Sequence, residues 1–233
     1  TIGVTGGTFV ENPEKYVVEG STVKKDETTG KYGVEKAYLA TVGDKSYYTM
    51  DEAFKAQTTS SEPIVLLRDY TTGSSFPSGS INRTVDLDGH TWTYTGSDVN
   101  SAAFEVNHPN VMLTVKNGTV VSNSMVGLIP SAIGGTIKYP NSGLVFEKVE
   151  ATANGHSGIE TNGGNESVSV TLKDSTLNVP NGFGIYFPSS GKLTIDNSKI
   201  TAKTLGVQVC SGSLDIKGQN AAITVSGDPV PKT

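Results

Sequence analysis

Apolar and polar residues alternate in short segments, and these segments repeat along the second half of the chain. The segment 170–177 is followed by a matching one at 193–200, and a third begins at Leu214. Alternation with a period of two predicts strands whose apolar side chains share one face. A repeat of roughly 20 to 25 residues is typical of stacked repeat proteins. The pattern therefore predicts strands that stack on one another.

The repeat extends toward the N-terminus when the segments are aligned without gaps. Each aligned segment begins with an apolar residue: Val85, Leu113, Leu144, Val170, Leu193 and Leu214. The inward positions change parity near Asn117, Asp174 and Asn197, where a bend is expected. Further strands are predicted at 103–106, 158–161, 184–187 and 206–209. Three strands and three corners per repeat predict an all-β, right-handed parallel β-helix, a solenoid, with Trp92 inside it.

The first 40 residues lack this repeat. A strand is predicted at 1–10, turning at Gly6 and Gly7, and the polar stretch after it holds a hairpin through Thr29 and Gly30. We interpret residues 1–40 as a connector, 41–228 as the β-helix and 229–233 as a tail. Because the chain starts at Thr1, we expect it to be part of a longer protein.

One short helix is predicted, at residues 49–56. Thr49 is followed three residues later by Glu52, the spacing of a capping box, and Met50, Ala53 and Phe54 form its apolar face. The first edge of a parallel stack would otherwise template aggregation. We therefore expect this helix to cover that edge as an N-terminal cap.

Two stretches resemble known families. Gly-Gly-Thr-Phe at 6–9, Asn-Pro at 12–13 and Gly-Lys-Tyr-Gly-Val at 30–34 resemble a segment that joins tandem modules in large secreted surface proteins of gut Firmicutes. The segments 47–56, 64–70 and 84–92 resemble the pectate-lyase-like right-handed β-helix superfamily, over about residues 42–227. The first resemblance implies a secreted or cell-surface bacterial setting. The second implies a right-handed β-helix. It implies no chemistry, because the superfamily includes lyases, hydrolases, tailspikes and non-enzymatic adhesive domains.

Charged residues recur at one outward position of the aligned repeats, and their signs alternate. The column is Asp88, Lys116, Glu147, Lys173, Asp196 and Lys217. Its acids lie two repeats apart, roughly 9–10 Å, with a lysine between them. They are too far apart to share a Ca²⁺ ion, which needs several oxygens at about 2.3–2.6 Å. We interpret the column as structural and predict no metal site there.

Asp86 and Asp88 form the first catalytic alternative. Two residues apart on one strand, they lie about 7 Å apart, which suits an inverting glycosidase pair. A solvated strand face that leads into the Asp88-Gly89 turn explains them better. The histidines, His90, His108 and His156, fall in predicted turns without the spacing of a zinc site.

Composition narrows the function further. The chain of 233 residues has a net charge of −5 and a single cysteine, Cys210. An acidic balance does not favour nucleic acid or an anionic membrane surface, and one cysteine excludes an internal disulfide. No apolar run approaches the roughly 20 residues of a membrane span. No cofactor is predicted.

The best candidate binding surface lies on the third strand of each repeat. Its outward residues are Glu105, Glu160, Tyr186 and Gln208, and the longest insertion, 130–142, adds Lys138 and Tyr139. Loops on a rigid scaffold are common binding sites. An ordinary solvated face explains these residues equally well.

We interpret the chain as a non-catalytic module of a secreted or surface protein, a rigid stalk or adhesive domain that contacts glycans or host proteins. The alternative is a carbohydrate-active enzyme, a polysaccharide lyase or glycoside hydrolase, that uses Asp86 and Asp88 or Glu105 and Glu160. A spacer without a ligand is the third interpretation. The sequence predicts neither the ligand nor the oligomeric state.

Overall fold

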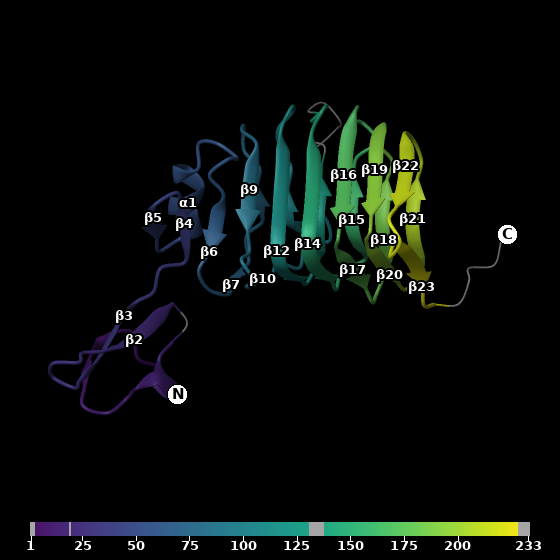
Figure 1. Ribbon diagram of the computed structural model, residues 1–233. Helices are drawn as coiled ribbons and strands as arrows, with labels where there is room; N and C mark the ends of the chain where they lie inside the picture. The colour runs from purple at the N-terminus through teal and green to yellow at the C-terminus, as the bar shows by residue number, and fades with distance from the viewer. Residues whose placement is uncertain (1–2, 19, 131–137, 228–233) are drawn as a thin grey trace.

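The computed structural model describes residues 3–18, 20–130 and 138–227, which form three β-sheets and one short α-helix (Figure 1). The first sheet is antiparallel and has the strand order β1-β3-β2. Its strands are β1 (Gly7–Phe9), β2 (Ser21–Lys25) and β3 (Tyr32–Lys36), and a 3₁₀ turn, η1 (Glu14–Tyr16), lies between β1 and β2.

The predicted hairpin through Thr29 and Gly30 is confirmed by the antiparallel pairing of β2 and β3. The Asp26 carboxylate accepts hydrogen bonds from the backbone N–H of Thr28 and of Thr29, and Gly30 supplies the positive φ of 67°. The predicted first strand is displaced, since β1 begins at Gly7 rather than ending there. The proposed boundaries at residues 40 and 228 stay a prediction.

The second sheet has fourteen strands and the third has six. The fourteen are β4 (Ala40–Val42), β5 (Lys45–Tyr47), β6 (Ile64–Leu66), β7 (Tyr70–Thr72), β9 (Arg83–Asp86), β10 (Thr91–Tyr94), β12 (Met112–Ser122), β14 (Gly143–Ala153), β16 (Val168–Lys173), β17 (Thr176–Val179), β19 (Gly191–Asp196), β20 (Lys199–Ala202), β22 (Ser213–Lys217) and β23 (Ala222–Val225). The six are β8 (Phe76–Pro77), β11 (Ala102–Glu105), β13 (Met125–Ile129), β15 (Ser157–Thr161), β18 (Phe183–Phe187) and β21 (Leu205–Val209).

The predicted right-handed parallel β-helix is wrong. The chain is all-β, but its strands belong to separate open sheets, and none of the sheets in the described part of the chain closes or forms a solenoid. The repeat period determines which strands become parallel neighbours. It does not determine whether the sheets join into a closed turn, because that depends on the corner geometry rather than on the spacing.

Parallel pairing between the first strands of successive repeats follows the predicted alignment from Leu113 onward. At the second strand of the last repeat, Ile200 pairs with Ile223 and not with Ala221, the residue aligned with it. Leu113 pairs with Leu144, and the same line continues through Val170, Leu193 and Leu214. The order of strands along the chain is visible as the run from β9 to β22 in Figure 1. The inward positions are buried from Leu113 to Ile195, as period-two alternation requires, whereas Leu214 and Ile216 of the last repeat are exposed.

The alignment of Val85 is wrong by two residues. Val85 pairs with Val115, although the later position Trp92 pairs with Val120 as predicted. The corner between them accounts for the difference, because it contains the turn at Asp88 and Gly89, both with positive φ. An alignment without gaps could not place these extra residues.

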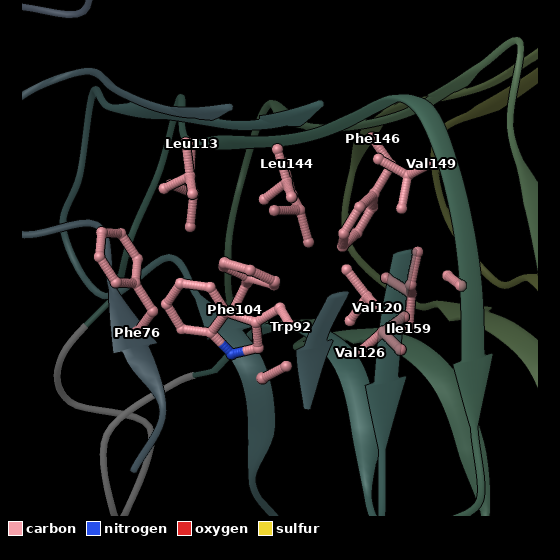
Figure 2. Close-up of a cluster of buried hydrophobic side chains, with 14 of the residues drawn as sticks. Phe76, Trp92, Phe104, Leu113, Val120, Val126, Leu144, Phe146, Val149 and Ile159 are labelled. Carbon is pink, nitrogen blue, oxygen red and sulfur yellow. The ribbon is translucent and has the colours of Figure 1, made fainter. Parts of the chain in front are cut away.

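Aromatic side chains fill the core between the fourteen-stranded sheet and the six-stranded sheet (Figure 2). Trp92 of β10 packs against Phe104 of β11 with ring centroids 4.8 Å apart and against Phe76 of β8 at 5.6 Å. Phe104 in turn lies 6.2 Å from Phe146 of β14. Trp92 is 1% exposed, so its predicted place in the core is confirmed.

The predicted helix is confirmed as α1 (Met50–Ala56), with its capping box. The Glu52 N–H donates to the Thr49 hydroxyl at 3.3 Å, and the Glu52 carboxylate accepts from the Thr49 N–H at 3.0 Å. The hydroxyl of Thr49 lowers the pKa of Glu52. The helix does not cover the first sheet edge by itself, since the β4–β5 hairpin pairs antiparallel with β6 there.

Arg83 of β9 joins α1 to the parallel strands. Its guanidinium donates to the carbonyl of Ser78 at 2.7 Å and, at the end of α1, to the carbonyls of Phe54 at 2.9 Å and Gln57 at 3.2 Å. It also lies 3.6 Å from the centroid of the Phe54 ring. Burial lowers its pKa. A cation here satisfies carbonyls that a helix C-terminus leaves without intrahelical partners.

One corner of the repeat uses left-handed backbone in five successive segments. The residues with positive φ there are Asn117, Lys148, Asp174, Asn197 and Gly218. Asn197 donates from its side-chain amide to the Asp174 carboxylate at 2.7 Å. Asparagine, aspartate and glycine tolerate this conformation, whereas lysine gains nothing from it.

Replacing Lys148 with glycine is therefore expected to stabilise the chain by about 1 kcal/mol, because the φ of 54° strains a side chain with a Cβ. Urea unfolding measures the change. Lys148→Ala removes the same exposed side chain but keeps the Cβ, so it should change stability little. Equal stabilisation by both substitutions would show that charge, rather than backbone strain, is responsible.

Candidate functional site

The alternating charge column is present, but its first member is Asp86 rather than Asp88. Lys116 pairs with Asp86 on one neighbouring strand and with Glu147 on the other. The ammonium of Lys116 lies 3.2 Å from the Asp86 carboxylate, Lys173 lies 2.6 Å from Glu147, and Lys217 lies 3.4 Å from Asp196. The Glu147 carboxylate raises the pKa of Lys173 by its hydrogen bond.

The Asp86 carboxylate is occupied by structural contacts. Besides Lys116, it accepts hydrogen bonds from the side-chain amide of Asn117 at 3.0 Å and from the backbone N–H of Asp88 at 3.1 Å. Its side chain is 16% exposed. Asp88 lies in the turn with φ of 47°. These contacts fix a corner, and they do not place two carboxyl groups on either side of a substrate, as an inverting glycosidase requires.

The predicted outward residues of the third strand do share one line on the six-stranded sheet. Glu160 pairs with Tyr186, and Tyr186 pairs with Gln208. Toward the other edge the line continues through Leu128 to Glu105. We name this line the Glu160 column, which consists of Pro77, Glu105, Leu128, Glu160, Tyr186 and Gln208.

Sequence reasoning missed Leu128, which separates the two glutamates. It is 8% exposed and packs with Ala102 and Met125 in a small cluster apart from the main core. Glu105 and Glu160 therefore lie two strands apart, about 10 Å between their Cα atoms, with an apolar side chain between them. This is an unfavourable arrangement for a pair of catalytic carboxyl groups. The sequence signal for the strand that carries Leu128 was weak, because apolar and polar residues do not alternate at 125–129.

Glu160 is held by two side chains that sequence reasoning did not assign to the site. Its Oε1 accepts from the Ser157 hydroxyl at 2.8 Å and from His156 Nε2 at 2.9 Å. The side chain of Glu160 is 21% exposed, so the fixed carboxylate remains accessible. Ser157 donates to the glutamate rather than to His156, so this is not the hydrogen-bond chain of a nucleophilic triad.

Tyr186 stands beside Glu160 and is positioned by aromatic and polar contacts. The Phe183 ring lies edge-on to it at 6.3 Å and also lies 5.6 Å from the His156 ring. The Cys210 side chain, hydrogen-bonded to the Tyr186 hydroxyl, raises the pKa of Tyr186. A tyrosine hydroxyl is protonated at neutral pH and can donate a hydrogen bond to a ligand. Glu105, farther along the column, accepts from the Ser75 hydroxyl at 2.9 Å.

The insertion predicted to flank this surface, 130–142, is described only at its two ends, Pro130 and 138–142. Residues 131–137 lie outside the described residues. The Tyr139 N–H donates to the Asn165 side chain at 2.8 Å, and Asn165 donates to the Pro130 carbonyl at 2.9 Å. Asn165 thus ties Tyr139 to the segment just after β15, the strand that carries Glu160. Lys138 adjoins Tyr139.

No cluster of three or more His, Cys, Asp or Glu side chains with metal-binding geometry occurs in ranges 3–18, 20–130 and 138–227. Cys210 is an exposed free thiol. No described helix is long and apolar enough to cross a membrane.

No protein-family model, curated protein or solved structure matches the chain. The resemblances to the pectate-lyase-like superfamily and to the connectors of surface proteins therefore stay predictions.

Proposed function

We propose that the chain is a non-catalytic binding module of a secreted or cell-surface bacterial protein, and that the Glu160 column contacts glycans or glycosylated host proteins. The observation that carries the proposal is the register of the six-stranded sheet. It brings a fixed carboxylate, an aromatic ring and an amide, from Glu160, Tyr186 and Gln208, onto three adjacent strands.

The chemistry of this column suits a sugar. A carboxylate and an amide accept or donate hydrogen bonds to hydroxyl groups, and an aromatic ring supplies an apolar contact for a pyranose face. The contacts of Glu160 with His156 and Ser157 hold its carboxylate before a ligand arrives, which lowers the entropy lost on binding. The parallel strands give the rigid support that the stalk interpretation requires.

A glycan array followed by calorimetric titration of the strongest ligand tests this function. Tyr186→Ala is expected to weaken binding at least about tenfold, because truncation of a contact aromatic commonly removes more than 1 kcal/mol. Glu160→Gln should also weaken binding, and Tyr186→Phe should separate the contribution of the ring from that of the hydroxyl.

Thr201→Ala is the matched control, since Thr201 is an exposed strand residue on β20 of the other large sheet. An equal loss in Thr201→Ala and Tyr186→Ala would remove the Glu160 column from the binding site. Cleavage of a polysaccharide panel by the wild-type chain, lost in Glu160→Gln, would instead establish the enzyme alternative.

A further inference from the structure

A small cavity is lined by helix α1 and by strands β7, β8 and β10. Its volume is about 180 Å³. A cavity of about 150 Å³ with apolar walls is enough for a benzene-sized ring. The apolar residues of its walls are Met50 and Phe54 of α1, Tyr70 of β7, Phe76 and Pro77 of β8, and Trp92 of β10. The cavity therefore has room for one aromatic ring and a short side chain.

Aromatic rings make up most of these walls and meet one another edge to face. The Trp92 ring lies 4.8 Å from that of Tyr70 and 5.6 Å from that of Phe76, at interplanar angles of 79° and 87°. Phe76 and Trp92 are seen side by side in Figure 2. Phe54 meets Phe76 in the same way at 5.5 Å. Aromatic pairs prefer such edge-to-face or offset contacts, so a planar ring suits these walls.

Trp92 brings a hydrogen-bond donor to the cavity that the chain leaves unused. Its indole N–H is buried and has no hydrogen-bond partner among the described residues. A buried N–H without an acceptor is unfavourable, and a buried tryptophan normally finds one. A ligand that fills the cavity can supply the missing acceptor.

Hydroxyl groups in the lining are already engaged within the chain. The Thr72 hydroxyl accepts from the backbone N–H of Ser74 at 3.0 Å. The Ser75 hydroxyl donates to the Glu105 carboxylate at 2.9 Å. They offer little to a ligand with many hydroxyl groups. A ring that carries one acceptor therefore suits this cavity better than a sugar does.

Asp51 gives the cavity its charge. Among the described residues that line it, Asp51 is the only charged one, and it is exposed. A positive group on the ligand is attracted to this carboxylate, and a negative group is repelled. The charge therefore favours a cationic ligand.

We propose that this cavity binds a small aromatic amine. Its ring lies among Tyr70, Phe76 and Trp92, a ring oxygen or nitrogen accepts from the indole N–H, and its ammonium group pairs with Asp51. Ser75 joins the cavity wall to Glu105 of the Glu160 column. The site nevertheless does not depend on the function proposed above, because none of these contacts requires a glycan.

Three related probes test the proposal: tyramine, phenethylamine and hydroxyphenylpropionate. Trp92 is the only tryptophan in the chain, so isotope-labelled protein gives one indole N–H signal, which is followed by NMR during each titration. We expect tyramine to shift this signal saturably. Phenethylamine lacks the oxygen acceptor and should bind about tenfold more weakly. Hydroxyphenylpropionate carries the opposite charge and should bind about fivefold more weakly than tyramine.

Asp51→Asn is expected to remove the preference for tyramine over hydroxyphenylpropionate, and because Asp51 is exposed this variant should still fold. Asp44→Asn is the matched control and should keep the preference, since Asp44 is an exposed aspartate between β4 and β5 that does not line the cavity.

Three results would overturn the proposal: no saturable shift with tyramine, equal affinity for tyramine and phenethylamine, or an equal effect of the two substitutions. A nuclear Overhauser contact between the indole N–H and a water molecule that tyramine does not displace would overturn it as well, because water alone would then satisfy Trp92.

Discussion

Replacing Leu172 with aspartate is expected to abolish cooperative folding. Leu172 is 1% exposed and lies between Phe146 and Ile195 on the adjacent strands. Loss of the leucine alone costs about 2–5 kcal/mol, and a buried carboxylate without a partner adds several more. The sum approaches the whole stability of a typical domain, about 5–15 kcal/mol. Circular dichroism melting and the dispersion of amide NMR signals measure the loss.

Thr171→Asp is the control for this substitution. Thr171 is the preceding residue on the same strand, points to the opposite face and is partly exposed. It should fold with a melting transition close to that of the wild type. A cooperative, wild-type-like transition in Leu172→Asp would contradict the inward assignment of this position.

Arg83→Met is expected to destabilise the chain by about 3 kcal/mol, which corresponds to a fall in Tm of roughly 6–12 °C. Methionine keeps apolar contact with Phe54, so the loss reports the hydrogen bonds together with the contact of the cation with the Phe54 ring. Without the guanidinium, the carbonyls of Phe54, Gln57 and Ser78 lose a charged donor. Urea unfolding gives the free energy directly.

Arg83→Lys separates charge from geometry. A lysine keeps the cation at the end of α1 but cannot reach all three carbonyls in the fixed geometry of a guanidinium. Its stability should lie between those of the wild type and Arg83→Met. If Arg83→Met were as stable as the wild type, the connection between α1 and β9 would rest on apolar packing alone.

The pairing of strands was predictable where the repeat is regular. Leu193 and Leu214 each begin an apolar-polar-apolar segment, Leu-Thr-Ile and Leu-Asp-Ile, so period-two alternation and a similar spacing place them side by side. The capping box at Thr49 and Glu52 was predictable because it depends only on local geometry. Val85 was misplaced because the Asp88-Gly89 turn lengthens one corner. Sheet closure was predicted wrongly because it depends on how the corners join the sheets.

The candidate site was predictable in part. Strand parity is sufficient to put Glu160, Tyr186 and Gln208 on one face, and the register confirms that they are neighbours. The support of Glu160 by His156 and Ser157 was not predictable, because it depends on how the chain enters β15. The role of Arg83 had no sequence signal, since its partners are main-chain carbonyls, one five residues earlier at Ser78 and the others at the end of α1.

The central claim is that segments one repeat apart pair in parallel and so bring the residues of the Glu160 column together. Nuclear Overhauser contacts on isotope-labelled protein test it most directly. The structure predicts backbone contacts of Ile185 with Val207 and of Tyr186 with Gln208, in the pattern of parallel strands. Contacts that instead connected these segments in antiparallel order, or showed Tyr186 and Gln208 on strands that do not adjoin, would contradict it.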